Sequence, residues 1–175
     1  MKKHFFTLIE LMVVIAIIAI IIGLILPIIQ SVKEQAKKTQ ALAQMNAIIT
    51  AIRTYESTYG ILPLPDAWTD TNVTNKYDDL MALLTNVPAP ETEATYTAGN
   101  ARHIRFLDVP TNYTTNSFID PWGEKYLIYV DSGYAGSVVV NAGSGNETLY
   151  GSVFIYSNAG QSGSINASKC IYSWK

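Results

Sequence analysis

The sequence predicts an α+β protein in which a long N-terminal α-helix packs, through its C-terminal half, on a small antiparallel β-sheet. Three observations predict this fold. An uncharged apolar run occupies residues 11–29, an amphipathic pattern continues it to residue 59, and short β-branched runs separated by Gly, Ser and Asn fill the C-terminal third. The 175 residues suffice for one globular domain and an anchor.

The apolar run has close to the ~20 residues that a helix needs to cross a bilayer. Lys2 and Lys3 precede it, and such a basic flank favours a cytoplasmic N-terminus. A cleaved secretory signal is one alternative, but its apolar region is typically ~7–15 residues long and is followed closely by a small-x-small site. A plain signal anchor is another, and it leaves Glu10 unexplained.

Glu10 is the one charged residue between His4 and Lys33. A carboxylate at the centre of a membrane costs roughly 2.5–3.5 kcal/mol, so such residues usually have a partner or a function. The alternative is that Glu10 lies at the level of the lipid headgroups and is solvated there.

The second half of the helix is amphipathic, because its apolar residues recur at mostly three- or four-residue steps. Gly60 and Pro63 end it. Pro27 lies inside the helix and removes one backbone donor, which predicts a kink unless the proline only marks the exit from the membrane. The recurring apolar residues are Val32, Ala36, Leu42, Met45, Ile49, Ile52 and Tyr59.

The head, residues 60–175, contains one predicted short helix over 76–84, with Tyr77, Leu80, Met81 and Leu84 on one face. Residues 85–113 read as a long loop. The segment Asp120-Pro121-Trp122-Gly123 has the composition of a type I turn. Strands are predicted over 126–130, 137–141, 152–157 and 170–174, with a hairpin loop at 143–145.

The N-terminal residues Phe6-Thr7-Leu8-Ile9-Glu10-Leu11, with the apolar run that follows, resemble the class III signal of type IV pilins and type II secretion pseudopilins. The resemblance implies a leader of residues 1–5, cleavage by a prepilin peptidase between Phe5 and Phe6, and N-methylation of Phe6. It also implies that Glu10 pairs with the Phe6 amine of a neighbouring subunit, which offsets the cost of burying both charges.

One position departs from that family pattern. The family has Gly or another small residue before the cut, whereas this chain has Phe5. Three outcomes are therefore open: slow cleavage, cleavage by a variant enzyme, or retention of the precursor. The implied organisation is a leader (1–5), a membrane-spanning or filament-core helix (6–29), an amphipathic helix (30–59) and a periplasmic head (60–175).

Two segments of the head are similar to the major pseudopilin of type II secretion. They are Asp120-Pro121-Trp122-Gly123 with Tyr126, and residues 154–160 with the terminal Trp174. The resemblance implies a non-enzymatic subunit of a secretion pseudopilus in the bacterial inner membrane, with its head in the periplasm. Its partners would be further copies, minor pseudopilins, a prepilin peptidase, a platform membrane protein and an ATPase. The alternatives are a type IV pilus minor pilin and a membrane-tethered binding module that does not polymerise.

Chemical sites are sparse. The major pseudopilin of the resembled family binds calcium in the loop after its last long strand, but residues 158–168 contain no Asp or Glu. Asn158, Gln161 and Ser162 offer neutral oxygens only, so we expect no cofactor and weak or absent calcium binding. We expect His103 to be a surface residue and the lone Cys170 to be a small packed residue. The mildly acidic chain, with net charge −2, does not favour nucleic acid binding.

Overall fold

The protein is described by a computed structural model of residues 7–63, 77–86, 99–109, 118–131, 133–141, 145–161 and 165–175, in which the side chains of residues 25–28 are not described. The chain divides into two compact units, Met1–Lys37 and Lys38–Lys175. The predicted α+β class is confirmed, with a long N-terminal helix and small antiparallel sheets.

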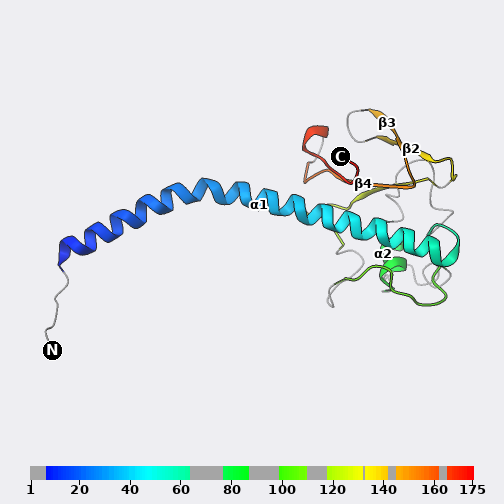
Figure 1. The fold of residues 1–175 in the computed structure, drawn as a ribbon, viewed down its shortest axis with the longest axis horizontal. Coiled ribbons are helices and arrows are strands. Elements are labelled where there is room, and N and C mark those ends of the chain that lie inside the picture. Colours follow the sequence, from blue (N-terminus) through cyan, green and yellow to red (C-terminus); the bar gives the residue numbers. More distant parts are fainter. Residues whose placement is uncertain are drawn as a thin grey trace. The chain divides into compact units, whose positions relative to one another are not determined.

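Helix α1 runs from Leu8 to Tyr59 (Figure 1). It ends where Gly60 adopts a left-handed conformation, with φ of 74°. The amide of Gly60 donates to the carbonyl oxygen of Glu56 at 2.7 Å, so one of the last free carbonyls is satisfied. A glycine in this position is a common way to stop a helix, because it has no Cβ to strain the turn.

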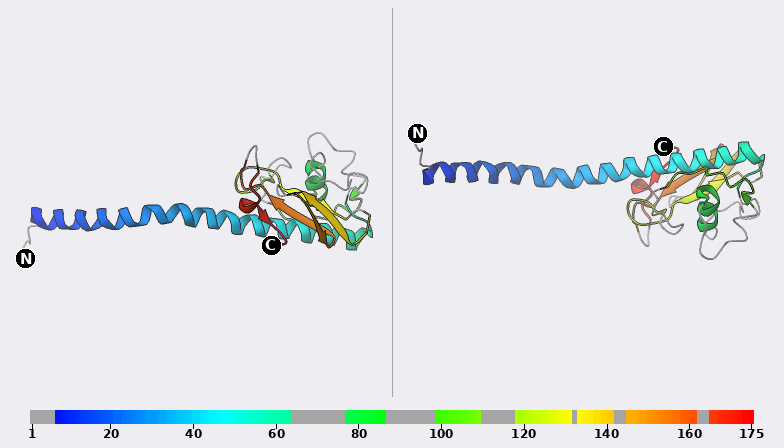
Figure 2. Two further views of the ribbon diagram at one scale, coloured as in Figure 1. Left: turned by 90° about the horizontal axis from the view of Figure 1, so that it is seen from above. Right: turned by 90° about the horizontal axis from the view of Figure 1, so that it is seen from below.

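The second unit, Lys38–Lys175, is here called the head unit, and its core is built on one side of α1. Its buried residues recur every three or four positions, as the amphipathic pattern predicts. They pack with helix α2 (Tyr77–Thr85) and with one face of strands β1 (Leu127–Val130) and β4 (Val153–Ser157) (Figures 1 and 2). The α1 residues in this core are Ala41, Met45, Ile48, Ala51, Ile52 and Tyr55.

Strands β1, β4 and β5 (Ile171–Tyr172) form an antiparallel sheet with β4 in the middle. Successive side chains point to opposite faces of a strand. Ile128 and its cross-strand partner Ile155 therefore lie in the core against α1. Tyr129 and its partner Phe154 lie in a second cluster with further aromatic residues. All five residues of β4 are buried, so this strand holds the two clusters together.

A second sheet is the hairpin of β2 (Ser137–Asn141) and β3 (Asn146–Tyr150). Val138 and Val140 of β2 contribute to the second cluster. Strand β3 was not predicted from the sequence, and the last strand is two residues long instead of covering 170–174. Strand β3 was missed because it has no buried residue and its composition is mostly polar.

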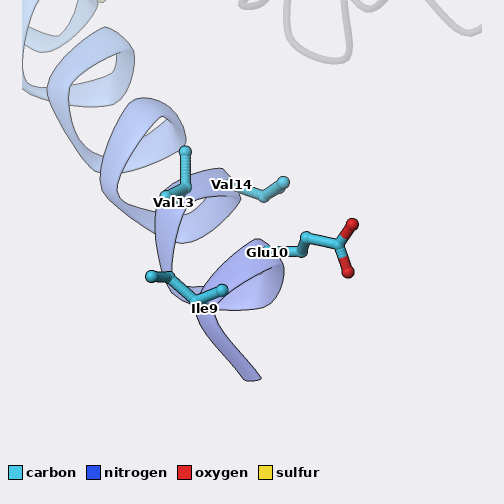
Figure 3. A pocket seen from close by; sticks show the side chains of 4 residues that line it. All are labelled: Ile9, Glu10, Val13 and Val14. Atoms are coloured by element: carbon cyan, nitrogen blue, oxygen red, sulfur yellow. The ribbon is translucent and has the colours of Figure 1, made fainter. Parts of the chain in front are cut away.

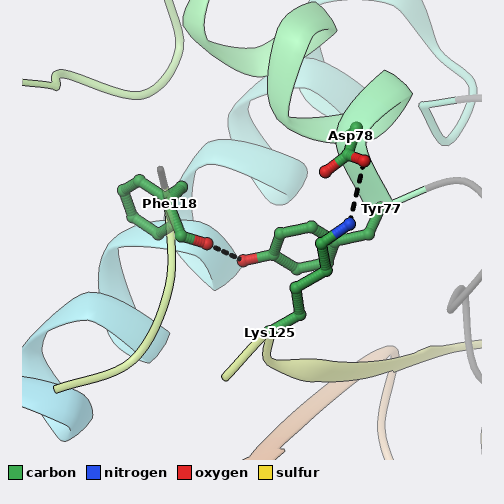
Figure 4. A network of polar contacts seen from close by, with 4 residues as sticks. All are labelled: Tyr77, Asp78, Phe118 and Lys125. Carbon is green, nitrogen blue, oxygen red and sulfur yellow. Dashed lines mark hydrogen bonds and ion pairs between the residues drawn. The ribbon is translucent and has the colours of Figure 1, made fainter. Parts of the chain in front are cut away.

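Helix α2 is buried on more sides than expected. The sequence predicted one apolar face, but eight of its nine residues are buried, including Asp79 and Thr85. Its first turn is held by two residues that precede β1, Phe118 and Lys125 (Figure 4). The Tyr77 hydroxyl donates to the carbonyl oxygen of Phe118 at 2.7 Å. The Lys125 ammonium lies 2.8 Å from a carboxylate oxygen of Asp78 and 5.6 Å from the centre of the Tyr77 ring.

Asn100 connects residues 99–109 of the predicted loop to both helices through hydrogen bonds. The side-chain amide of this buried residue donates to the carbonyl oxygens of Leu83 and Ile104, and its oxygen accepts from the Tyr59 hydroxyl at 2.8 Å. A buried amide with so many partners fixes the segment, because leaving any of them unpaired would cost free energy. The segment therefore behaves as part of the head core.

Candidate functional site

The N-terminal part of α1 exposes its apolar side chains on every side. From Leu8 to Leu24 the large apolar residues retain between 45% and 77% of their accessible surface. Exposed apolar area of this extent marks a surface that binds lipid or another protein. Taken singly, none of the described helices meets the length and hydropathy criterion for a membrane crossing, whereas the bent pair Leu8–Leu24 and Ile29–Tyr59 meets it together.

Pro27 lies within the helical backbone of α1, in the break between those two segments. The kink assigned to it stays a prediction, because its side chain belongs to the four that are not described. The positions proposed for cleavage and methylation, Phe5 and Phe6, lie outside the described residues.

Glu10 forms a reciprocal cap with Thr7 at the start of α1. The backbone amide and the hydroxyl of Thr7 each donate to Oε2 of Glu10 at 2.7 Å. The Glu10 amide in turn approaches the Thr7 hydroxyl oxygen at 3.4 Å and donates to the Thr7 carbonyl oxygen at 3.1 Å. This is the capping box, in which residues three apart satisfy helix donors that have no partner within the helix.

The capping box was missed at the sequence level, although a signal for it was present. Thr7 stands three residues before Glu10 and directly ahead of the apolar run, which is the spacing that the box requires. The negative carboxylate also lies in the first turn, where the helix dipole favours it. Glu10 therefore has a local structural role in the single chain, in addition to any role between chains.

Both Thr7 contacts fall on one oxygen of the Glu10 carboxylate. The other, Oε1, accepts no hydrogen bond from any residue within the described ranges. The carboxylate extends from the helix beside a shallow groove lined by Ile9, Val13 and Val14 (Figure 3). These apolar side chains strengthen any charge pair that forms beside them once water is excluded, because the local dielectric constant falls.

The Asp120 turn is a second predicted site, and it belongs to the head unit. The Gly123 amide donates to the Asp120 carbonyl oxygen at 3.0 Å, which closes a four-residue turn through Pro121 and Trp122. The buried Asp120 carboxylate accepts from the amides of Trp122 and Glu124 at 3.0 and 2.8 Å.

The same carboxylate connects the turn to the chain after β4. The hydroxyl of Ser157 donates to the second oxygen of Asp120, and the Ala159 amide donates to the Ser157 hydroxyl oxygen at 2.9 Å. Trp122 then packs on Gly160, where an added Cβ would lie 3.0 Å from the Trp122 Cβ. The two head segments that resemble the major pseudopilin are thus brought together in space.

Tyr126 follows the turn and anchors it to α1. Its hydroxyl donates to Oε1 of Gln44 at 2.5 Å. Burial raises the pKa of the Tyr126 hydroxyl, and the nearby Asp120 carboxylate raises it further. The phenol therefore stays protonated at physiological pH, and its hydroxyl keeps the hydrogen that it donates to Gln44.

The loop after β4 contains the neutral oxygens considered for calcium. Asn158 and Gln161 are half-buried, and Ser162 lies outside the described residues. The described ranges hold no group of three or more His, Cys, Asp and Glu side chains that suits a metal ion. His103 is exposed, with a left-handed φ of 51°, and Cys170 is a buried free thiol.

Comparison of the chain with family models, with curated proteins and with solved structures finds no match.

Proposed function

We propose that the protein is a membrane-anchored structural subunit that polymerises through the N-terminal part of α1, and specifically a subunit of a type II secretion pseudopilus. The observation that carries the proposal is the arrangement at Glu10. A single carboxylate stands in the otherwise uncharged, exposed apolar part of α1, with one oxygen held by Thr7 and with Ile9, Val13 and Val14 beside it.

In the proposed filament, the Oε1 atom of Glu10 accepts from the Phe6 amine of a neighbouring subunit. Removal of residues 1–5 creates that amine one position before Thr7. The exposed apolar side chains between Leu8 and Leu24 contact lipid before assembly and other copies of the helix afterwards. Charge pairing supplies register, because the apolar surface alone has no feature that selects one axial position.

The choice of a secretion pseudopilus over a type IV pilus rests on the head. The Asp120 turn and the glycine loop after β4 carry the short motifs that resemble the major pseudopilin, and the two segments touch through Trp122 and Gly160. We place the head in the periplasm and the N-terminus of the precursor in the cytoplasm, as the Lys2 and Lys3 flank favours.

The decisive experiment is a filament assay on Glu10→Gln in cells that express the chain's own assembly genes. This substitution keeps the size of the side chain and an oxygen for Thr7, but removes the charge. We expect normal amounts of protein in the membrane fraction. We expect no filaments, either in the material sheared from the cells or on overexpression. The matched control is Glu124→Gln, because the Glu124 side chain is exposed on the head.

Two results would contradict parts of the proposal. Wild-type filament levels in Glu10→Gln would remove the pairing role of Glu10. A wild-type chain that stays monomeric in the membrane under overexpression, with the assembly genes present, would favour the non-polymerising alternative. Mass spectrometry of the membrane-extracted chain checks processing: we expect a methylated N-terminus at Phe6, and a start at Met1 would contradict cleavage.

A further inference from the structure

The chain after β4 folds into a closed loop, here called the glutamine loop and defined as residues 158–161 and 165–170. Its closing residue is Gln161. The side-chain nitrogen of Gln161 donates to the carbonyl oxygen of Asn158 at 2.8 Å and to that of Asn166 at 3.3 Å. The same nitrogen lies 3.6 Å from the sulfur of Cys170. The side-chain oxygen accepts from the Asn166 amide at 2.9 Å.

These contacts put one neutral amide group where the two ends of the loop meet. An amide nitrogen carries two hydrogens and no lone pair for accepting, so it suits a site surrounded by carbonyl oxygens and a thiol. The Cys170 thiol completes the arrangement by approaching the Asn166 carbonyl oxygen at 3.7 Å. Gln161 therefore links the start of the loop, its return and the residue before β5.

The same oxygens do not suit a calcium ion. Calcium takes six to eight oxygen ligands, usually with several carboxylates among them. Here the carbonyl oxygens of Asn158 and Asn166 already face the Gln161 nitrogen, which a cation would have to displace. The side-chain oxygen of Asn166 accepts from Ser168. Among the residues that the structure describes, Oδ1 of Asn158 is buried and has no hydrogen-bond partner.

We propose that the Gln161 side chain closes this loop in place of a cation, so that the head keeps its C-terminal strand in position without calcium. The proposal deepens the proposed function, since the calcium question arises from the pseudopilin resemblance. It identifies a neutral side-chain link between the end of β4 and Cys170 as a substitute for a metal. Secretion conditions poor in divalent cations would leave such a subunit folded.

Cys170 provides a direct readout of loop closure, because it is the only cysteine and its thiol is buried inside the loop. The experiment follows the rate of maleimide labelling of the full chain in detergent micelles, with calcium or with a chelator. We expect slow labelling of the wild type at the same rate in both conditions. In Gln161→Ala the loop opens more often, and we expect labelling about tenfold faster.

Gln40→Ala is the matched control, because Gln40 is exposed on α1 and its loss should leave the labelling rate unchanged. Gln161→Glu is a second variant that keeps the side-chain size and exchanges the donor nitrogen for an anionic oxygen. We expect fast labelling of this variant in chelator and slower labelling with calcium, since the carboxylate now repels the carbonyl oxygens and attracts the ion.

Three results would overturn the proposal: calcium that slows labelling of the wild type, wild-type labelling in folded Gln161→Ala, or wild-type labelling of Gln161→Glu in chelator. Labelling is measured on the unassembled chain. A failure here therefore leaves the filament proposal untouched, and a chain without filaments leaves the glutamine loop untouched.

Discussion

The two halves of α1 differ in how their apolar residues are distributed around the helix and in whether these residues are buried. In the N-terminal half every large apolar side chain from Leu8 to Leu24 is exposed in the single chain. In the C-terminal half, Met45, Ile48 and Ile52 are fully buried, and polar residues fill the opposite side. A uniform distribution requires apolar surroundings on all sides, whereas a periodic one requires a core on one side.

An Ile→Asp substitution made in each half of α1 tests this difference, and we expect the largest effect on stability in the C-terminal half. In Ile48→Asp an unpaired carboxylate enters the core of the head, where its burial costs about 3–5 kcal/mol. We expect this variant to lose most of its cooperative thermal unfolding, measured by near-ultraviolet circular dichroism in detergent. The total stability of a domain is typically only about 5–15 kcal/mol, so the loss is a large fraction of it.

Ile18→Asp is the partner experiment, because Ile18 is 49% exposed and lies in the middle of the apolar run. We expect an unchanged unfolding temperature for the head and a smaller carbonate-resistant membrane fraction, since a central Asp costs roughly 2.5–3.5 kcal/mol on insertion. If Ile18→Asp also lowered the unfolding temperature of the head, the division of labour between the two halves would be wrong.

Within the head, the Asp120 carboxylate is expected to give the next largest effect. Asp120→Ala leaves the amides of Trp122 and Glu124 and the hydroxyl of Ser157 without their acceptor. We expect a loss of roughly 3 kcal/mol in the free energy of unfolding, measured by urea titration. Glu124→Ala is the control and should change stability by less than about 0.5 kcal/mol, as exposed positions usually do. Equal losses in the two variants would contradict the structural role of Asp120.

At the other end of α1, the capping box predicts a smaller and local effect. Thr7→Ala removes the hydroxyl that links Thr7 to Glu10, and the loss of such a cap typically costs about 1 kcal/mol. We expect faster amide hydrogen exchange in the first turn of α1 and no change in the head. Thr7→Ser keeps the hydroxyl and should exchange at the wild-type rate, so faster exchange in that variant would argue against the cap.

The smallest expected effect is the dependence of head stability on alkaline pH. Burial, followed by the neighbouring Cys170, raises the pKa of Tyr172 to about 12 from its ordinary value of 10.0. The unfolded chain therefore releases this proton at lower pH than the folded chain does. The contribution of Tyr172 to stability is complete below pH 10 and is lost as the pH rises from about 10 to about 12.

Tyr172→Phe checks this assignment. The variant also loses the hydrogen bond from the hydroxyl to the Ala167 carbonyl oxygen, which lowers stability at neutral pH as well. Its urea midpoint should nevertheless fall less steeply than that of the wild type above pH 10. Parallel curves for the two proteins over that range would show that Tyr172 does not contribute to the alkaline loss.

Residues whose pattern is periodic were predictable from the sequence. The extent of α1 follows from the spacing of its apolar residues and from Gly60, and the turn at Asp120 follows from the order of Asp, Pro and Gly. Strand β4 could be predicted because four consecutive residues of high β propensity, Val153 to Tyr156, stand between glycine- and asparagine-containing segments.

Residues whose role depends on distant partners were not predictable. Strand β3 alternates between exposed and half-buried residues, and its polar composition gives no signal without its partner β2. The glutamine loop depends on where the chain returns after residue 165, which no local spacing specifies. The pairing of Asp120 with Ser157 joins residues 37 positions apart for the same reason.

The β2–β3 hairpin lies in the sequence between β1 and β4, and this order has a consequence for how the head assembles. Antiparallel strands joined by a short connection form within microseconds, and the entropy lost on closing a loop grows with its length. Once the hairpin exists, it shortens the flexible chain that separates Val130 from its partner Val153. We therefore expect the least buried pair of strands in the head to form early and to guide the most buried strand to its neighbour.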